Sequence, residues 1–407
     1  MSESQLSARD RLRLLGAASA AMAAPGALAA PAADRYPRNL TKDDIDRWMN
    51  ELSNWGRWGK DDSAGTVNLI TNAKRKQAAA LIREGISVSM SLDADIAPNP
   101  AKGPDPAKDP VPSGCRQFTQ VKSYGSGGSV TTSLKLGDCP AADAPLPAPA
   151  PTPPAEGARD GGGRGNEPRY TWQHVMRSTG QNMRGPSGYA VDTISVNYHG
   201  NNTTHFDALS HFIFNGHIYN GYPASVITTW GAEKDDVVAF KDGLVTRGVL
   251  VDWPRFKNVP YMGDDEAIYA EDLDAWEKKS GVKIESGDCV LVRTGRWKRV
   301  AEKGPLDLNK QAPGLYASAG RWLKDRDIAL LGSDVVQDVR PSRVEGVNQP
   351  IHQMFLVAVG TPLFDNCDLE AASDQAAKLR RSTFCMMVAP LRVPGATGSP
   401  FNPLALF

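Results

Sequence analysis

The sequence predicts an α/β fold, because segments typical of strands and of helices alternate along the chain. From residue 170 onward, short apolar runs are followed by longer stretches in which apolar residues recur with helical spacing. The chain has 407 residues, of which 41% are hydrophobic and 23% charged. That composition is ordinary for a globular protein.

The first 33 residues have the layout of an export signal. Three arginines, Arg9, Arg11 and Arg13, precede an Ala- and Leu-rich stretch, and small residues at 27 and 29 stand where a signal peptidase reads. We expect residues 1–33 to direct export to the periplasm. The alternative is a disordered Ala-rich tail on a cytoplasmic protein.

Two helices and a strand are expected next. Thr41 and Asp44 form the pattern of a capping box, followed by Ile45, Trp48 and Leu52 on one helical face. The predicted second helix covers residues 70–85 and ends at a glycine, and the predicted strand covers residues 86–97.

Residues 98–168 are rich in proline and then in glycine, and they cannot bury enough apolar surface to offset their ordering entropy. We expect an exposed insertion within a single domain of residues 34–407, and the rival interpretation is a linker between two domains. Cys115 and Cys139 lie in this region, and the sequence leaves open whether they pair.

The remaining elements are predicted from apolar runs and helix-stop residues. Strands are expected at 192–200, 246–253, 287–295, 328–334 and 381–393, and helices at 268–281, 312–327 and 351–360. The last of these strands is expected to close the fold. Cys289 and Cys385 lie in strand-like runs and are expected to be buried.

The charge balance argues against nucleic acid and membranes as partners. There are 46 basic and 46 acidic side chains, so no long-range field attracts polyanions. No apolar run is long enough to span a bilayer. A small molecule is the expected partner.

The stretch YHGNNTTHFDALSHF, residues 198–212, holds three of the six histidines of the chain. His205 and Asp207 are two apart, so on a strand their side chains leave the same face. A bend at GNN can turn His199 toward the same point, and His211 follows Asp207 by four residues. Imidazole and carboxylate ligands suit zinc and manganese equally.

This stretch resembles the histidine-rich signature of the cyclase family of metal-dependent hydrolases, which includes bacterial kynurenine formamidase and isatin hydrolase. The resemblance extends to WGRWGKDDSAGTVNLIT, IESGDCVLVRTGRW and PIHQMFLVAVGTPLFDNCDLE. It covers most of residues 48–395 outside the insertion. It implies a swivelling β/β/α domain, in which helices surround a barrel-like mixed sheet, and it implies a homodimer or homotetramer.

The resemblance also implies roles for individual residues. The implied metal ligands are His199, His205, Asp207, His352 and Asp365. Here five residues separate the first two histidines where the family signature has three, and Asp365 stands where related members have glutamate. His211 matches the family's proton carrier.

The implied activity is hydrolysis of an amide or ester, such as a cyclic amide, a lactone or an aryl formamide, by water that a metal ion activates. The alternatives are a polyketide-type cyclase or dehydratase, and a protein that binds a metal or small ligand without turnover. Three further residues are candidates for binding substrate: Asp334, His217 and Phe212. Asp334 could instead cap a helix, and His217 could be a loop residue without a role.

Overall fold

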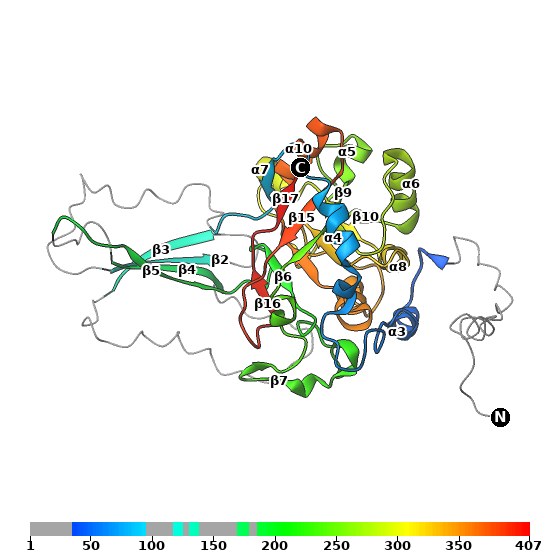
Figure 1. The fold of residues 1–407 in the computed structure, drawn as a ribbon, viewed down its shortest axis with the longest axis horizontal. Helices are drawn as coiled ribbons and strands as arrows, with labels where there is room; N and C mark the ends of the chain where they lie inside the picture. The colour runs from blue at the N-terminus through cyan, green and yellow to red at the C-terminus, as the bar shows by residue number, and fades with distance from the viewer. Residues whose placement is uncertain (1–34, 95–116, 125–129, 138–168, 179–184) are drawn as a thin grey trace, which may run out of the picture. The chain divides into compact units, whose positions relative to one another are not determined.

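The central element of the computed structural model is a nine-stranded mixed sheet (Figure 1). In spatial order its strands are β1 (Ser87–Ser89), β17 (Leu404–Leu406), β15 (Thr383–Val388), β9 (Leu244–Asp252), β11 (Cys289–Arg293), β13 (Leu330–Ser333), β14 (Leu363–Asp365), β6 (His205–Asp207) and β16 (Gly398–Pro400). The four strands β9, β11, β13 and β14 are parallel, and the strands on either side of them join antiparallel. The expected α/β fold with a curled mixed sheet is confirmed.

The residues that the structure describes are 35–94, 117–124, 130–137, 169–178 and 185–407. Residues 38–407 form one compact unit. The predicted export signal and the two cysteines Cys115 and Cys139 lie outside the described residues.

Helices pack against the sheet and against one another. Their bounds are α3 (Lys42–Glu51), α4 (Asn72–Ala79), α5 (Trp253–Lys257), α6 (Ala270–Ser280), α7 (Arg296–Lys303), α8 (Ala317–Lys324), α9 (Pro350–His352), η6 (Gln353–Val359, a π-helix) and α10 (Glu370–Leu379). Helix α4 packs on β9 and β15, α5 on β11, and α8 on α6 and η6. All seven residues of η6 are buried, as the apolar run at 351–360 predicted. None of the helices in the described ranges is long and apolar enough to cross a membrane.

The remaining elements are short or belong to smaller sheets. The strands are β2 (Gln117–Tyr124), β3 (Val130–Gly137), β4 (Arg169–Ser178), β5 (Val191–Val196), β7 (Ile227–Thr228), β8 (Gly231–Ala232), β10 (Ala267–Ile268) and β12 (Gly314–Leu315). The 3-10 helices are η1 (Gly65–Leu69), η3 (Tyr219–Gly221), η4 (Ala224–Val226) and η5 (Val237–Phe240). Strands β2 to β5 form a four-stranded sheet in the order β3-β2-β4-β5, so two strands lie within residues 98–168, where the sequence predicted none.

Near the N-terminus, the sequence predicted correctly where the first helix begins but not where the second one ends. Thr41 accepts a hydrogen bond from the Asp44 backbone, and Asp44 accepts one from the Thr41 backbone, which confirms the capping box. The expected end of the second helix at Gly85 was wrong. Helix α4 stops at Ala79. Further along the predicted helix, the backbone amides of Glu84 and Ile86 donate to the carbonyl of Phe407 at 3.2 and 3.3 Å, so this part pairs with the C-terminal segment.

The expectation that strand 381–393 closes the fold was also wrong. Strand β15 covers only its first part, and two further strands, β16 and β17, follow it. Strand β17 adds to β15, while β16 crosses to the opposite end of the sheet and pairs with β6. These last strands are three residues long, too short to show a period in the sequence. The predicted burial of Cys289 and Cys385 is confirmed.

Alternation along β6 separates a polar face from an apolar one. His205 and Asp207 point to one face, while Phe206 between them packs on the other. The ring of Phe206 lies 5.0 Å from Phe240 and 5.5 Å from Phe364 between ring centroids. Burial of such aromatic side chains holds the strand in register, which fixes the direction of the two polar side chains.

Asp235 is a buried acid with an unusual environment. It is 1% exposed with φ 59°, and in the described part of the chain no hydrogen bond reaches either carboxylate oxygen. Burial raises the pKa of Asp235 to about 7; Ser63 opposes this and Asp62 adds to it. The protonated carboxyl is therefore the form that the fold favours.

Replacing Asp235 with asparagine is expected to stabilise the protein at pH 8. The unfolded carboxyl has its ordinary pKa of about 3.9, so the stability that the protonated form contributes is complete below that pH and is lost as the pH rises through 7. A shift of this size corresponds to at most about 4 kcal/mol. Urea unfolding should show that Asp235→Asn raises the free energy of unfolding, by an amount that grows from near zero at pH 4 to its maximum at pH 8. The exposed control Asp242→Asn should show no such trend, and a gain independent of pH would contradict the explanation.

Candidate metal centre

Two neighbouring strands carry three acidic or imidazole side chains to one point. In the antiparallel pair β6–β14, Asp365 lies directly opposite His205, and Leu363 lies opposite Asp207. His205, Asp207 and Asp365 are all buried, and their potential ligand atoms lie within 4.8 Å of one another. Asp207 and Asp365 are 158 positions apart in sequence, and the register of the sheet brings them together.

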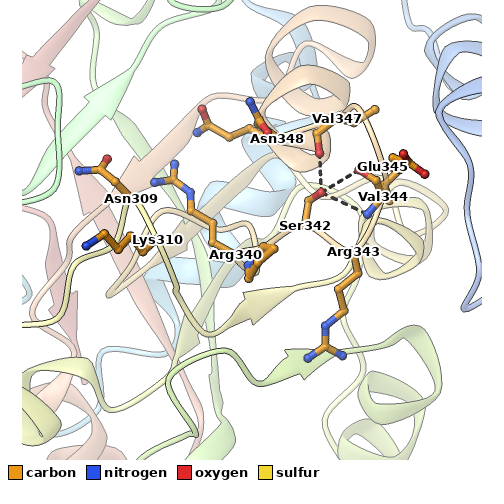
Figure 2. Close-up of a pocket in the computed structure, with 11 residues that line it drawn as sticks. Asn309, Lys310, Arg340, Ser342, Arg343, Val344, Glu345, Val347 and Asn348 are labelled. Carbon is orange, nitrogen blue, oxygen red and sulfur yellow. Dashed lines mark hydrogen bonds between the residues drawn. The ribbon is translucent and has the colours of Figure 1, made fainter. Parts of the chain in front are cut away.

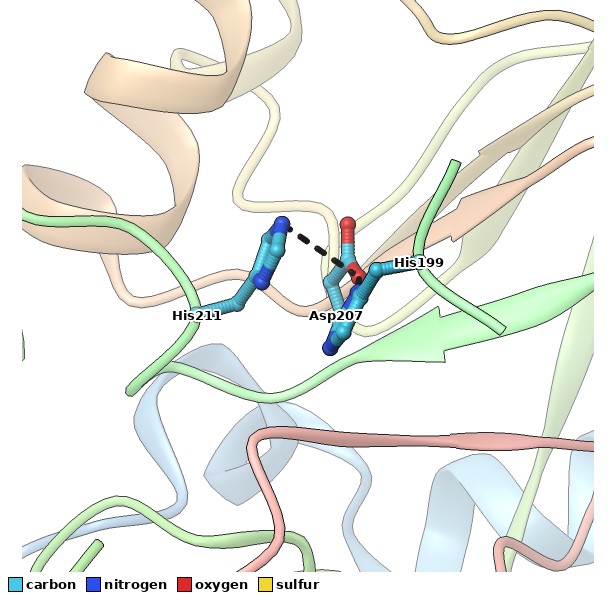
Figure 3. A group of neighbouring side chains, drawn as sticks. All are labelled: His199, Asp207 and His211. Atoms are coloured by element: carbon cyan, nitrogen blue, oxygen red, sulfur yellow. Dashed lines mark ion pairs between the residues drawn. The ribbon is translucent and has the colours of Figure 1, made fainter. Parts of the chain in front are cut away.

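Four imidazole rings surround the Asp207 carboxylate. Oδ1 lies 3.0 Å from Nδ1 of His199, 3.4 Å from Nε2 of His205 and 3.9 Å from Nε2 of His211. Oδ2 lies 4.0 Å from Nε2 of His352. Figure 3 shows His199, from the segment before β6, and His211, from the loop after it, converging on Asp207. We call these four histidines with Asp207 and Asp365 the histidine cluster.

The environment of Asp207 is suited to a carboxylate that binds a cation. It is 0% exposed, and no hydrogen bond from the described residues reaches either of its oxygens. Burial by itself would raise the pKa of the Asp207 carboxyl, but His211, His205 and His199 hold it well below its usual range. An ionised carboxylate buried without hydrogen bonds is costly unless a cation compensates it.

The tautomers of two histidines are set by their second nitrogen. Nδ1 of His205 donates to the backbone carbonyl of Thr203 at 2.8 Å, and Nδ1 of His352 donates to Oδ2 of Asp338 at 2.6 Å. Nδ1 therefore carries a proton in each ring, and Nε2 faces the cluster. This arrangement, in which the outer nitrogen donates and the inner one faces the ligand site, is typical of histidines that bind metals.

His352 lies between two carboxylates that raise its pKa. Burial alone would lower the pKa of His352, but Asp338 and Asp365 outweigh it and raise the pKa to about 10. Nε2 lies 3.5 Å from Oδ2 of Asp365. Gln337 holds the other oxygen of Asp365 by a hydrogen bond of 2.9 Å.

His199 and His211 form the more open side of the cluster. Their rings stack at 3.8 Å between centroids with 8° between planes, and Nε2 of His199 lies 3.0 Å from the hydroxyl of Thr397. The side chain of His211 is 29% exposed. Burial lowers the pKa of His211 to about 4, since the nearby histidines add to the effect of burial and Asp207 offsets it only in part. His211 is therefore neutral at pH 7 and able to accept a proton.

The donor set fits a divalent ion such as zinc or manganese. Ligand atoms about 2.1 Å from a tetrahedral ion lie about 3.4 Å from one another, and the separations around Asp207 run from 3.0 to 4.0 Å. Imidazole nitrogens and carboxylate oxygens are the donors that both ions accept. Two groups meet the geometric requirement, one of His199, Asp207 and His211 and one of His205, Asp207 and Asp365.

The three residues predicted to bind substrate lie in different places. The ring of Phe212 is 6.2 Å from that of His352, beside the cluster. His217 is exposed, with Nδ1 bonded to the carbonyl of Asn215 and its ring 6.2 Å from that of Trp55. It is not one of the residues brought together around Asp207.

Asp334 is buried and caps helix α7. Its carboxylate accepts hydrogen bonds from the backbone amides of Thr294, Gly295 and Arg296 at 2.8, 2.8 and 3.2 Å. Of the two roles that the sequence left open for Asp334, capping a helix is the one that the structure shows. The positive end of the helix dipole favours a carboxylate at this position.

Several residues of the site escaped the sequence analysis. Asp338, Gln337, Thr203 and Thr397 hold the ligands in orientation without belonging to a recognisable motif. Asp338 also accepts from the backbone of Ile351 at 2.6 Å, so it fixes the first turn of α9 as well as the ring of His352. No local signal marks such residues, because their partners are set by the fold.

Replacing Asp338 with asparagine is expected to weaken metal binding by about 10- to 100-fold, the usual cost of losing a carboxylate behind a ligating histidine. The neutral amide no longer favours the Nδ1 proton that leaves Nε2 free. Competition with a chelator of known affinity measures the change. The exposed Asp374→Asn serves as control, and equal affinity in both variants would contradict a supporting role for Asp338.

Comparison with known proteins gives the same family that the motif resembles. Residues 128–337, just over half of the chain, match the Cyclase family model. A crystal structure described as that of a novel cyclase superposes with a TM-score of 0.65 at 25% sequence identity, covering 88% of this chain and 99% of that chain.

Other solved structures are more distant. Isatin hydrolase A from Labrenzia aggregata, bound to benzyl benzoate, gives a TM-score of 0.41 at 23% identity, covering 57% of this chain and 82% of that chain. A predicted metal-dependent hydrolase from Bacillus stearothermophilus gives 0.35 at 18% identity, covering 57% and 86%. No curated protein matches the chain. From the family match, together with the shared fold and the buried histidine cluster, we conclude that this protein belongs to the Cyclase family.

Proposed function

We propose that this protein is a metal-dependent hydrolase that cleaves an amide or ester bond in a small molecule, of the cyclic amide, lactone or aryl formamide type. The observation that carries the proposal is the buried carboxylate of Asp207, which lies within 4.0 Å of ring nitrogens of four histidines. The ligands would be His199, His205, Asp207, His352 and Asp365. The hydrolases among the distant structural relatives support this reaction class.

When bound, a divalent ion would lower the pKa of water and place a positive charge beside the substrate carbonyl. The chain's own residues provide orientation and proton transfer. His205 and His352 are held by Thr203 and Asp338, so the cluster is organised before substrate arrives. His211 is neutral, partly exposed and 3.9 Å from Asp207, so its Nε2 can take a proton from water and return it to the leaving nitrogen or oxygen.

The test combines metal content with hydrolysis. Elemental analysis of protein purified without added metal should find zinc or manganese, and formanilide or dihydrocoumarin should be hydrolysed. Treatment with a chelator should abolish hydrolysis, and adding back the ion should restore it. Hydrolysis that survives complete removal of metal would rule out the proposed chemistry.

Two other functions remain distinct outcomes. A polyketide-type cyclase or dehydratase would form a ring or release water from a substrate without hydrolysing either test compound, which product analysis would show. A protein that only binds a metal or ligand would hold metal without turnover. The partly exposed and neutral His211 favours turnover, because a binding protein has no use for a proton carrier beside the ligands.

Export to the periplasm and assembly into a homodimer or homotetramer stay predictions. Cell fractionation with detection of the mature N-terminus tests the first. Light scattering of the purified protein tests the second.

A further inference from the structure

A polar cavity lies along the segment between Asp338 and His352 and takes no part in the chemistry described above. It has a volume of about 740 Å³, within the range of small-molecule sites, and Figure 2 shows its lining. Its charged residues are Lys310, Arg340, Arg343 and Glu345, so three positive charges face one negative charge. Amide side chains such as Asn309 and Asn348 complete much of the wall.

The loop that walls this cavity is tied to the metal centre at both ends. Asp338 begins it and accepts hydrogen bonds from Ile351 and His352, where it ends. Residues 340–345 and 347–349 between these points line the cavity. On the opposite wall, Asn309 accepts a hydrogen bond of 3.3 Å from Asn201, which lies between His199 and His205. Both walls are therefore continuous with segments that carry ligands of the cluster.

The guanidinium of Arg340 makes one hydrogen bond to the described residues. Its Nη1 donates to the carbonyl of Leu308 at 2.7 Å, and no carboxylate of the described residues lies within 4.0 Å of its guanidinium. Figure 2 shows this guanidinium extending toward the side of the cavity that Asn309 and Asn348 line. The guanidinium of Arg343, in contrast, is held by Tyr269 and the carbonyl of Asp265.

Lys310 adds a second positive charge on the same side. Its side chain is 83% exposed, and Nζ lies 3.5 Å from the carboxylate of Asp307. A planar guanidinium with free N–H groups is suited to a carboxylate, which it can bind through two parallel hydrogen bonds. Neighbouring amide groups of asparagine offer further donors.

We propose that this cavity binds a carboxylate group of the substrate through Arg340, with Lys310 in support, while the scissile bond lies at the histidine cluster. The role of this cavity in catalysis rests on the proposed hydrolase function, whereas the binding of the anion does not. The substrate class is then small molecules that carry a carboxylate in addition to the bond that is cleaved.

Calorimetry with phthalate on the purified, metal-containing protein tests binding alone. Phthalate should bind, and the neutral phthalamide should not. Arg340→Gln should weaken phthalate binding about 10- to 100-fold, the usual effect of losing a charge-assisted hydrogen bond. Lys310→Gln, at an exposed position that tolerates substitution, should weaken it by a smaller factor. The exposed Arg83→Gln is the matched control for loss of one positive charge and should bind phthalate as the wild type does.

Binding of phenyl phosphate, compared with that of benzoate, tests whether the cavity prefers a carboxylate or a phosphate. Tighter binding of phenyl phosphate than of benzoate, with the same dependence on Arg340, would overturn the assignment to carboxylates. Phthalate affinity that is equal in wild type, Arg340→Gln and Lys310→Gln would overturn the site itself, since binding would then occur elsewhere.

Matched substrates connect the cavity to turnover. The wild type should show a higher kcat/KM for 4-formamidobenzoate than for formanilide, and the ratio should fall toward one in Arg340→Gln, mainly through KM. Arg83→Gln should keep the wild-type ratio. If both compounds are hydrolysed with a ratio that Arg340→Gln leaves unchanged, the carboxylate site is wrong and the hydrolase function stands. If neither is hydrolysed while phthalate binds through Arg340, the hydrolase function fails and the anion site stands.

Discussion

Asp207→Asn is expected to lose the metal ion and to reduce hydrolysis by about a thousandfold or more. Asp207 is the residue that both candidate ligand groups share, and its carboxylate lies within 4.0 Å of a ring nitrogen of each of the four histidines. Charge stabilisation by a bound ion contributes several kcal/mol to the transition state, and each 1.36 kcal/mol is a tenfold change in rate. The amide of asparagine has nearly the same shape but no charge to hold the cation.

Metal content and thermal stability make this result independent of the choice of substrate. In the wild type, added zinc or manganese should raise Tm, because an ion that binds only the folded state stabilises it. Asp207→Asn should show neither bound metal nor this shift, while the exposed Asp242→Asn should match the wild type in both. One equivalent of metal retained by Asp207→Asn would show that the cluster does not depend on this carboxylate.

His211→Ala is expected to lower kcat by about 10² to 10⁴ while the protein keeps its metal, because general acid–base catalysis usually contributes that much. Elemental analysis separates this role from that of a ligand. The stack of His211 on His199 makes both roles geometrically accessible, so metal content decides between them. Loss of the ion together with activity would make His211 a ligand.

The pH profile gives a second measurement on His211. Its pKa is lowered to about 4, so the neutral form that accepts a proton persists well below the ordinary histidine value of about 6.5 and is lost only as the pH falls toward 4. The acid limb of kcat in the wild type should therefore lie below pH 6. His217→Ala is the matched control, since its exposed ring lies outside the cluster, and it should keep both rate and profile. An acid limb at or above pH 6.5 that disappears in His211→Ala would contradict the neutral resting state.

The local part of the site could be read from the sequence, because its geometry follows from strand alternation. His205 and Asp207 share a face since they are two residues apart on β6, and the bend before them returns His199. The resemblance to the family added His352 and Asp365, which spacing alone does not connect to β6. The antiparallel register that sets Asp365 opposite His205 depends on how the whole sheet is assembled.

Other features required the folded chain. Asp338 and Gln337 look like ordinary polar residues in the sequence, and only tertiary contacts give them the tasks of orienting His352 and Asp365. The strands β2 and β3 are eight residues long and lie in a region rich in proline and glycine. The average composition of that region argues against regular structure, so the two strands were not predicted. The short strands β16 and β17 carry too few residues for a periodic signal.

The position of β6 in the sheet has a consequence for the order in which the histidine cluster is assembled. This strand is hydrogen-bonded on one edge to β14 and on the other to β16, both of which come from later in the chain. During synthesis, His205 and Asp207 leave the ribosome almost 200 residues before Pro400, the partner of His205 in β16. Until that partner is made, the two ligands lie on a strand with open edges and without Asp365 or His352 beside them. The histidine cluster is therefore complete only after the last strands have been made, and an ion that requires all of its ligands is expected to bind after synthesis.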